Sequence, residues 1–124
     1  MRVVLTDRRF TDREPYREAV EEAGGELVAV EAETEAEVVA ACRDADVVVT
    51  FKAPISRAAI EAMEDCRLIM RNGAGFDNVD VAAASEHGIP VSNVPGYGND
   101  DVASHAVALM HAAAHEIVHA DRDV

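Results

Sequence analysis

The sequence predicts an α/β fold: a five-stranded parallel sheet with helices on both faces. Three observations lead to this fold class. Five short apolar runs alternate with segments of helical pattern, the connections between them are short, and several runs are apolar at consecutive positions. Consecutive apolar residues are typical of strands buried on both faces. Strands and helices that alternate in this way form one parallel sheet through right-handed crossovers.

The apolar runs give the strands and the capping residues give the helices. The expected strands cover residues 2–6, 26–30, 47–50, 68–70 and 89–92. Capping boxes at 11–14 and 34–37 open helices that extend to about residues 23 and 43. Ser56 caps a short helix over 57–63. A fourth helix covers 80–87, and glycines at 24–25 and 88 end the first and fourth helices.

The last stretch of the chain predicts one long helix over 101–120, capped by Asn99 or Asp100. Its apolar residues cover more than one face, because valine, leucine, methionine and isoleucine alternate with many alanines. A helix so apolar is expected to have neighbours on two sides.

The chain is strongly acidic, with 24 acidic and 11 basic residues and a net charge of −13; Lys52 is its single lysine. Such a surface repels nucleic acid and anionic membranes, so neither is expected as a partner. It also repels itself unless salt screens the charges. One hypothesis is therefore a protein adapted to a salt-rich cytoplasm, and the alternative is an ordinary acidic protein.

The two cysteines, Cys42 and Cys66, lack the C-x-x-C spacing of redox or metal motifs. They are most simply small buried hydrophobic residues in a reducing compartment. The N-terminus becomes charged too soon for a signal peptide, and no apolar run approaches the length that spans a membrane. We therefore expect a soluble, cytoplasmic chain.

Residues 71–80, Arg-Asn-Gly-Ala-Gly-Phe-Asp-Asn-Val-Asp, are the centre of the predicted site. They join the fourth strand to the fourth helix, and two glycines one residue apart let the backbone turn sharply. Backbone N–H groups at such a turn favour an anion, and open α/β sheets bind ligands at the carboxyl ends of their strands. The sequence therefore predicts a small anion cradle here. A tight turn with no ligand is the alternative.

This stretch resembles the D-isomer-specific 2-hydroxyacid dehydrogenases, whose members show R-x-G-x-G-[hydrophobic]-D-N-[IV]-D. The family's next motif, G-I-x-V-x-N-x-P, is matched at 88–95, and its V-A-[E/D/S]-H is matched at 102–105. The resemblance implies a flavodoxin-like substrate domain over 1–98 and an inter-domain helix over 99–124. It also implies a D-2-hydroxy or 2-oxo acid as substrate and NAD as cofactor, with NADP left open.

The resemblance also implies roles for three residues. Backbone N–H groups at Ala74 and Gly75 hold the substrate carboxylate, the position of Ala74 also contacts the nicotinamide, and Tyr97 faces the substrate in some lactate-type relatives. No G-x-G-x-x-G fingerprint follows in this sequence, and the family's catalytic Arg, Glu and His have no counterpart in it. No catalytic residue is therefore assigned, and the nucleotide-binding domain is expected to be absent.

Several residues have a structural and a functional interpretation. The structural interpretation of Tyr97 is a half-buried loop residue, and that of Lys52, which could attract a substrate anion, is a solvated lysine; both are favoured over the functional ones. The side chains of Asp77, Asn78 and Asp80 are expected to cap a helix and hold turns rather than act as acids or metal ligands. Three histidines recur every four residues on the last helix, at 111, 115 and 119, where they can chelate a metal or face solvent; no metal site is assigned.

The sequence leaves two main hypotheses for the function. The first is the substrate-side fragment of an NAD-dependent oxidoreductase that acts on the CH–OH group of D-2-hydroxy acids, inactive alone. The second is a non-enzymatic interaction module that uses residues 101–120 to form a homodimer or to pair with a separate nucleotide-binding domain. A third and weaker hypothesis is a stand-alone flavodoxin-like domain, which lacks the Ser/Thr-rich phosphate loop expected after its first strand.

Overall fold

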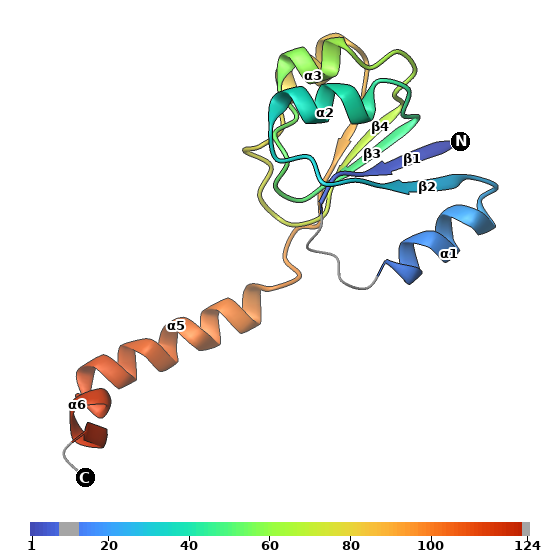
Figure 1. Ribbon diagram of the computed structural model, residues 1–124. Coiled ribbons are helices and arrows are strands. Elements are labelled where there is room, and N and C mark those ends of the chain that lie inside the picture. Colours follow the sequence, from blue (N-terminus) through green and yellow to red (C-terminus); the bar gives the residue numbers. More distant parts are fainter. Residues whose placement is uncertain (8–12, 123–124) are drawn as a thin grey trace.

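The computed structural model describes residues 1–7 and 13–122. Its centre is one parallel sheet with the strand order β2-β1-β3-β4-β5, as Figure 1 shows. The strands are β1 (Arg2–Leu5), β2 (Glu26–Ala29), β3 (Val47–Thr50), β4 (Leu68–Arg71) and β5 (Val91–Ser92). This order is the flavodoxin-like one, so the expected fold class is confirmed.

The register of the sheet sorts its side chains onto two faces. One row across all five strands is Val28, Val4, Val48, Ile69 and Val91. Because neighbouring positions on a strand point to opposite faces, the residues on either side of this row, such as Val3 and Leu5, belong to a second core. Both faces are therefore apolar, as the runs of consecutive valines predicted.

The helices divide between these two faces (Figure 1). Helix α1 (Glu14–Glu22) covers one face, where Tyr16 and Val20 pack on Val3 and Leu5. The other face packs against α2 (Glu35–Cys42), α3 (Arg57–Glu61) and α4 (Val81–Glu86). The larger core lies between that face and these three helices.

Three of the expected caps are confirmed. The Thr34 side chain accepts the Glu37 N–H while the Glu37 carboxylate accepts the Thr34 N–H, which is a complete capping box. Ser56 Oγ accepts the Ala59 N–H at 3.3 Å, and Asp80 Oδ1 accepts the Ala83 N–H at 2.8 Å. The box expected at 11–14 lies partly outside the described residues.

The glycine stops are also confirmed, because Gly24 and Gly88 have φ of 72° and 69° just after α1 and α4. Positive φ is easy only without a Cβ. The fifth strand is shorter than expected and begins at Val91.

The single long helix expected over 101–120 is wrong. The chain forms α5 (Asn99–Ala114) and α6 (Ile117–Arg122), separated by Glu116 with φ of 49°. No glycine or proline marks this point, so the sequence pattern gave no stop signal. The Glu116 carbonyl accepts the N–H groups of His119 and Ala120 and so begins a new helix.

The expected cap of the last helix is wrong as well. Asn99 is the first residue of α5, Gly98 is its N-cap, and no side chain caps it. Neither α5 nor α6 contains a buried residue, and α5 extends away from the sheet (Figure 1). None of the helices among the described residues has the length and apolarity needed to cross a membrane.

Candidate functional site

The loop after β4 is fastened on both sides. The Asn72 N–H donates to the Thr50 carbonyl at 2.8 Å, on the neighbouring strand β3. On the other side, the Val94 N–H donates to the Gly73 carbonyl at 3.0 Å, and Asn93 Nδ2 donates to the Ala74 carbonyl at 2.8 Å. These contacts turn the carbonyls of Gly73 and Ala74 toward the segment after β5.

The two N–H groups expected to bind an anion are available. Ala74 and Gly75 are exposed, and their N–H groups donate to no other described residue. Neighbouring backbone donors at the carboxyl edge of a parallel sheet, with no acceptor among the described residues, are groups that can bind an anion. We call residues 73–75 the cradle.

A guanidinium group lies against the cradle. The central carbon of the Arg71 guanidinium is 4.7 Å from the centroid of the Phe51 ring. A Cβ on Gly73 would lie 1.8 Å from Arg71 Nη1, so the Arg71 side chain occupies the space that any side chain at residue 73 would need. Because Nη1 is the far end of a flexible side chain, a residue larger than glycine at 73 is expected to displace the guanidinium from this place.

This guanidinium has no carboxylate partner. Among the described residues, no ion pair or hydrogen bond engages the Arg71 side chain, and its Nε is buried without an acceptor. In a chain with 24 acidic residues, an unpaired cation beside two free N–H groups favours an anionic ligand. From the sequence, Arg71 was recognisable only as the first residue of the family motif, without a role of its own. Its position two residues before a glycine, at the end of a strand, was the available signal.

The second half of the loop is structural, as expected for two of its three polar residues. The Ile55 N–H donates to the Asn78 carbonyl and the Asp80 N–H donates to the Ile55 carbonyl, at 2.8 and 2.9 Å. The Asn78 amide also donates to the Ala53 carbonyl at 2.8 Å. Asp77 differs, because its side chain makes no hydrogen bond to a described residue. Its Oδ1 would lie 3.3 Å from a Cβ on Gly75.

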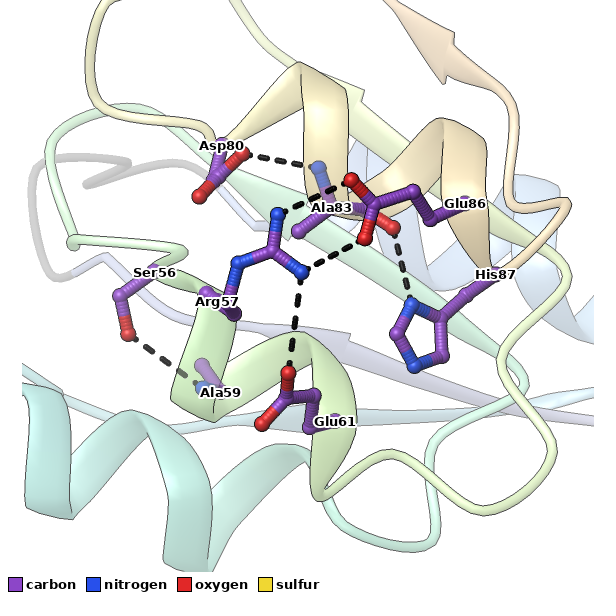
Figure 2. A network of polar contacts seen from close by, with 8 residues as sticks. All are labelled: Ser56, Arg57, Ala59, Glu61, Asp80, Ala83, Glu86 and His87. Carbon is purple, nitrogen blue, oxygen red and sulfur yellow. Dashed lines mark hydrogen bonds and ion pairs between the residues drawn. The ribbon is translucent and has the colours of Figure 1, made fainter.

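A polar network between α3 and α4 fixes these two helices to each other (Figure 2). The Arg57 guanidinium binds both Glu86 carboxylate oxygens, at 2.7 and 3.2 Å, and Glu61 Oε1 lies 3.7 Å from it. The hydrogen bonds with Glu86 raise the pKa of Arg57, and those with Arg57 lower the pKa of Glu86. The Glu86 carboxylate thus joins α4 to α3, while the Glu61 carboxylate pairs with Arg57 within α3.

Tyr97 lies with Ala74 at one hollow. The hollow has a volume of about 350 Å³ and is also lined by Gly98, Asn99 and Val102. Tyr97 lies in a turn, as its structural interpretation expected, but it is 68% exposed and not half-buried. The structure thus brings two of the predicted site residues to the same place.

Lys52 borders a different hollow, of about 210 Å³, at the ends of β1 and β3. Its side chain is exposed, and its backbone N–H donates to Asp7 Oδ1 at 2.9 Å. Asp7 is a buried carboxylate that was not predicted from the sequence. Three of its four hydrogen-bond partners lie 43 to 45 residues along the chain, so no local pattern marks it.

The three histidines do not form one stripe. The rings of His111 and His115 stack with centroids 6.0 Å apart, but His119 lies beyond the break at Glu116, in α6. Among the described residues, no group of three or more His, Cys, Asp or Glu side chains is placed to hold a metal.

Comparison with known proteins gives a consistent result. The family model of the D-isomer specific 2-hydroxyacid dehydrogenase catalytic domain matches residues 3–120. A D-3-phosphoglycerate dehydrogenase of Archaeoglobus fulgidus is 42% identical over 78 residues, covering 63% of this chain and 15% of that protein. The enzyme of the same name from Methanocaldococcus jannaschii is 36% identical over 118 residues, covering 94% of this chain and 22% of that protein.

Solved structures agree with the sequence matches. The NAD⁺-bound 3-phosphoglycerate dehydrogenase of Entamoeba histolytica superimposes with a TM-score of 0.75 and 31% identity, over 89% of this chain and 38% of that chain. An NAD-dependent formate dehydrogenase of Staphylococcus aureus, in complex with NAD, gives a TM-score of 0.75 and 30% identity, over 89% and 37%. The chain therefore spans well under two thirds of the length of each of these relatives.

Proposed function

Because the chain belongs to the D-isomer specific 2-hydroxyacid dehydrogenase family, we propose that it is the substrate-side part of an NAD-dependent oxidoreductase acting on the CH–OH group of D-2-hydroxy acids. Residues 1–98 would form the substrate domain, and 99–124 the helical segment leading to a nucleotide-binding domain. The observation that carries the proposal is the cradle: two free N–H groups beside an unpaired guanidinium.

The chain's own part in the reaction is to hold the acid. The substrate carboxylate accepts hydrogen bonds from the Ala74 and Gly75 N–H groups, and Arg71 supplies positive charge next to them. Tyr97, across the adjoining hollow, faces the rest of the molecule. Hydride transfer at C2 is the chemistry of the nicotinamide when it is bound. Within this chain we propose one contact with the cofactor, at Ala74.

The cradle is tested by titrating the ¹⁵N-labelled chain with glyoxylate and following the amide resonances of Ala74 and Gly75. Both should shift and saturate. Arg71→Met keeps apolar bulk but removes the cation, and we expect it to raise the dissociation constant roughly tenfold or more, the size of a lost charge-assisted hydrogen bond. Methyl glyoxylate, which lacks the carboxylate, is the matched ligand control. Equal shifts with acid and ester would contradict carboxylate binding.

Turnover is tested separately. The chain mixed with NADH and pyruvate, hydroxypyruvate or glyoxylate should consume no NADH, since no catalytic residue is assigned to it. Steady NADH loss that depends on the chain would overturn the claim that it is inactive alone.

One observation favours a second function, an interaction through residues 101–120. The six large apolar side chains of α5 and α6 are all exposed: Val102, Val107, Leu109, Met110, Ile117 and Val118. Apolar surface of this extent is typical of a face that packs on a partner, here a second copy or a separate nucleotide-binding domain. Light scattering over a range of concentrations tests self-association, and a strict monomer would exclude the homodimer.

The composition supports a cytoplasmic, salt-rich setting. A net charge of −13 makes the folded chain repel itself, and salt screens that repulsion. The melting temperature should therefore rise between low and molar KCl. A melting temperature that does not rise would contradict the hypothesis of salt adaptation and favour an ordinary acidic protein.

A further inference from the structure

Asp7 is a buried carboxylate at the end of β1, and the proposed function gives it no part. It is 7% exposed, yet its oxygens accept four hydrogen bonds. Oδ2 accepts the Phe51 N–H at 2.7 Å and the hydroxyls of Thr6 and Thr50 at 3.0 and 3.4 Å. Oδ1 accepts the Lys52 N–H at 2.9 Å. Burying a charge is costly unless such partners satisfy it, so this carboxylate is a fully partnered internal anion.

Its location is the place where the strand order of the sheet reverses. β1 and β3 are neighbours, but the chain leaves β1 toward α1 on one face and leaves β3 toward α3 on the other (Figure 1). Diverging connections open a crevice between the strand ends, where open α/β sheets bind ligands. Here the N–H groups of Phe51 and Lys52, which directly follow β3, donate to the Asp7 carboxylate, so the chain itself supplies the group that a ligand anion would otherwise provide.

The segment held by Asp7 also touches the cradle. Asp7 binds the backbone N–H of Phe51, and the ring of the same residue packs against the Arg71 guanidinium, whose Nη1 lies against Gly73. Farther along, Ile55 pairs with Val79, four residues after Gly75. The Phe51–Ile55 segment therefore contacts the cradle loop at two points, and Asp7 fixes where that segment begins.

We propose that Asp7 is a positioning residue for the cradle: its carboxylate acts as an internal anion that fixes Phe51 and Lys52 and, through the Phe51 ring, places the Arg71 guanidinium. The inference rests on the proposed function for the identity of the ligand but not for the geometry. The contacts follow one another from the Asp7 carboxylate to the Phe51 N–H and then from the Phe51 ring to the Arg71 guanidinium, which lies against Gly73.

The test is chemical rescue of Asp7→Ala by formate. The variant leaves two N–H groups and two hydroxyls facing a hole the size of a small carboxylate, beside a hollow that Asp7 already lines. In the ¹⁵N-labelled variant we expect displaced resonances at Phe51 and Lys52 and also at Arg71 Nε, Ala74 and Gly75. Formate should return the Phe51, Lys52 and Arg71 signals toward wild type. It should also lower the dissociation constant for glyoxylate, which we expect the variant to have raised about tenfold.

Asp46→Ala is the matched control. Asp46 also joins β1 to β3, but at the other end of the sheet, where its Oδ2 accepts the Arg2 N–H at 2.6 Å. This variant should leave Arg71, Ala74 and Gly75 unmoved. If Asp7→Ala does not fold, Asp7→Asn replaces it as the test variant. The amide keeps the shape of the side chain and one acceptor oxygen, but it presents an NH₂ group to one of the backbone N–H donors. Its Lys52 and Arg71 signals should still move.

The outcomes separate this inference from the proposed function. Displacement confined to Phe51 and Lys52, with Arg71 and the cradle unchanged, would overturn the positioning role whether or not glyoxylate binds. Failure of wild type to bind glyoxylate would overturn the proposed ligand, while the rescue of the Arg71 signal by formate would still support Asp7 as the residue that places it.

Discussion

The sheet with α1–α4, here called the sheet module, and the arm formed by α5 and α6 contain similar apolar residues. These residues are buried in the module and exposed in the arm. In the sheet module, Ile55, Ile60 and Ile69 are completely buried. In the arm, Val102 and Met110 are each 70% exposed. The difference lies in the surfaces available: helices cover both faces of the sheet, whereas no residue of α5 or α6 is buried. Hydrophobic residues contribute to stability only where a second surface removes them from water.

Paired substitutions of large apolar residues give the largest expected contrast. Ile69→Ala removes a fully buried side chain between β3 and β5 and should lower the free energy of unfolding by about 2–5 kcal/mol. Leu109→Ala on the arm should change it by less than about 0.5 kcal/mol. Urea unfolding followed by circular dichroism measures both. Equal losses would mean that the arm packs on the module in solution.

Alkaline pH should destabilise the module through Cys42. Burial raises the pKa of this thiol from 9.0 to about 12, so the folded state keeps its proton at a pH where the unfolded state has lost it. The contribution is fully present below pH 9.0 and is lost as pH rises toward 12, by about 1.4 kcal/mol per pH unit. The unfolding free energy should therefore fall more steeply above pH 9.0 in wild type than in Cys42→Ala. Parallel curves would contradict this.

Helix caps offer a smaller contrast. Asp80→Ala removes a side chain that accepts the Ala83 N–H, and it should cost about 1 kcal/mol. Asn99→Ala, at the start of α5, removes no capping bond and should cost a few tenths at most. Thermal unfolding compares the two. An equal cost would mean that Asn99 caps α5 in solution.

The smallest effect is expected at the break in the arm. Glu116 holds a left-handed backbone, which costs an L-residue roughly 1–2 kcal/mol. Glycine relieves that cost but loses about 0.5–1 kcal/mol more chain entropy on folding. Glu116→Gly should therefore change helix content by little and leave the module's unfolding midpoint unchanged. A marked loss of helical circular dichroism signal would indicate one continuous helix in solution.

Features set by neighbouring residues could be predicted from the sequence. Thr34 with Glu37, Ser56 with Ala59, and Asp80 with Ala83 are capping pairs three residues apart, and each is confirmed. The five strands follow from apolar runs in the same way. The break at Glu116 could not be predicted, because no residue type there disfavours a helix.

Features set by the fold were missed. Asp7 binds N–H groups 44 and 45 residues away, and Arg71 packs on Phe51, a residue at the end of a different strand. The motif at 71–80 located the cradle and includes Arg71, yet only the sheet order brings Phe51 to that guanidinium and Asp7 to the Phe51 N–H. Sequence spacing therefore found the backbone of the site and missed the side chains around it.

The occupied space at Gly73 has an evolutionary consequence. A Cβ at residue 73 would meet Arg71 Nη1, which is the far end of a flexible side chain and can move aside. A lineage that acquires alanine at 73 is therefore expected to keep its fold but to lose the present placement of the guanidinium. Descendants of this sequence with a larger residue at 73 should thus retain the sheet while the positive charge beside the loop changes its position.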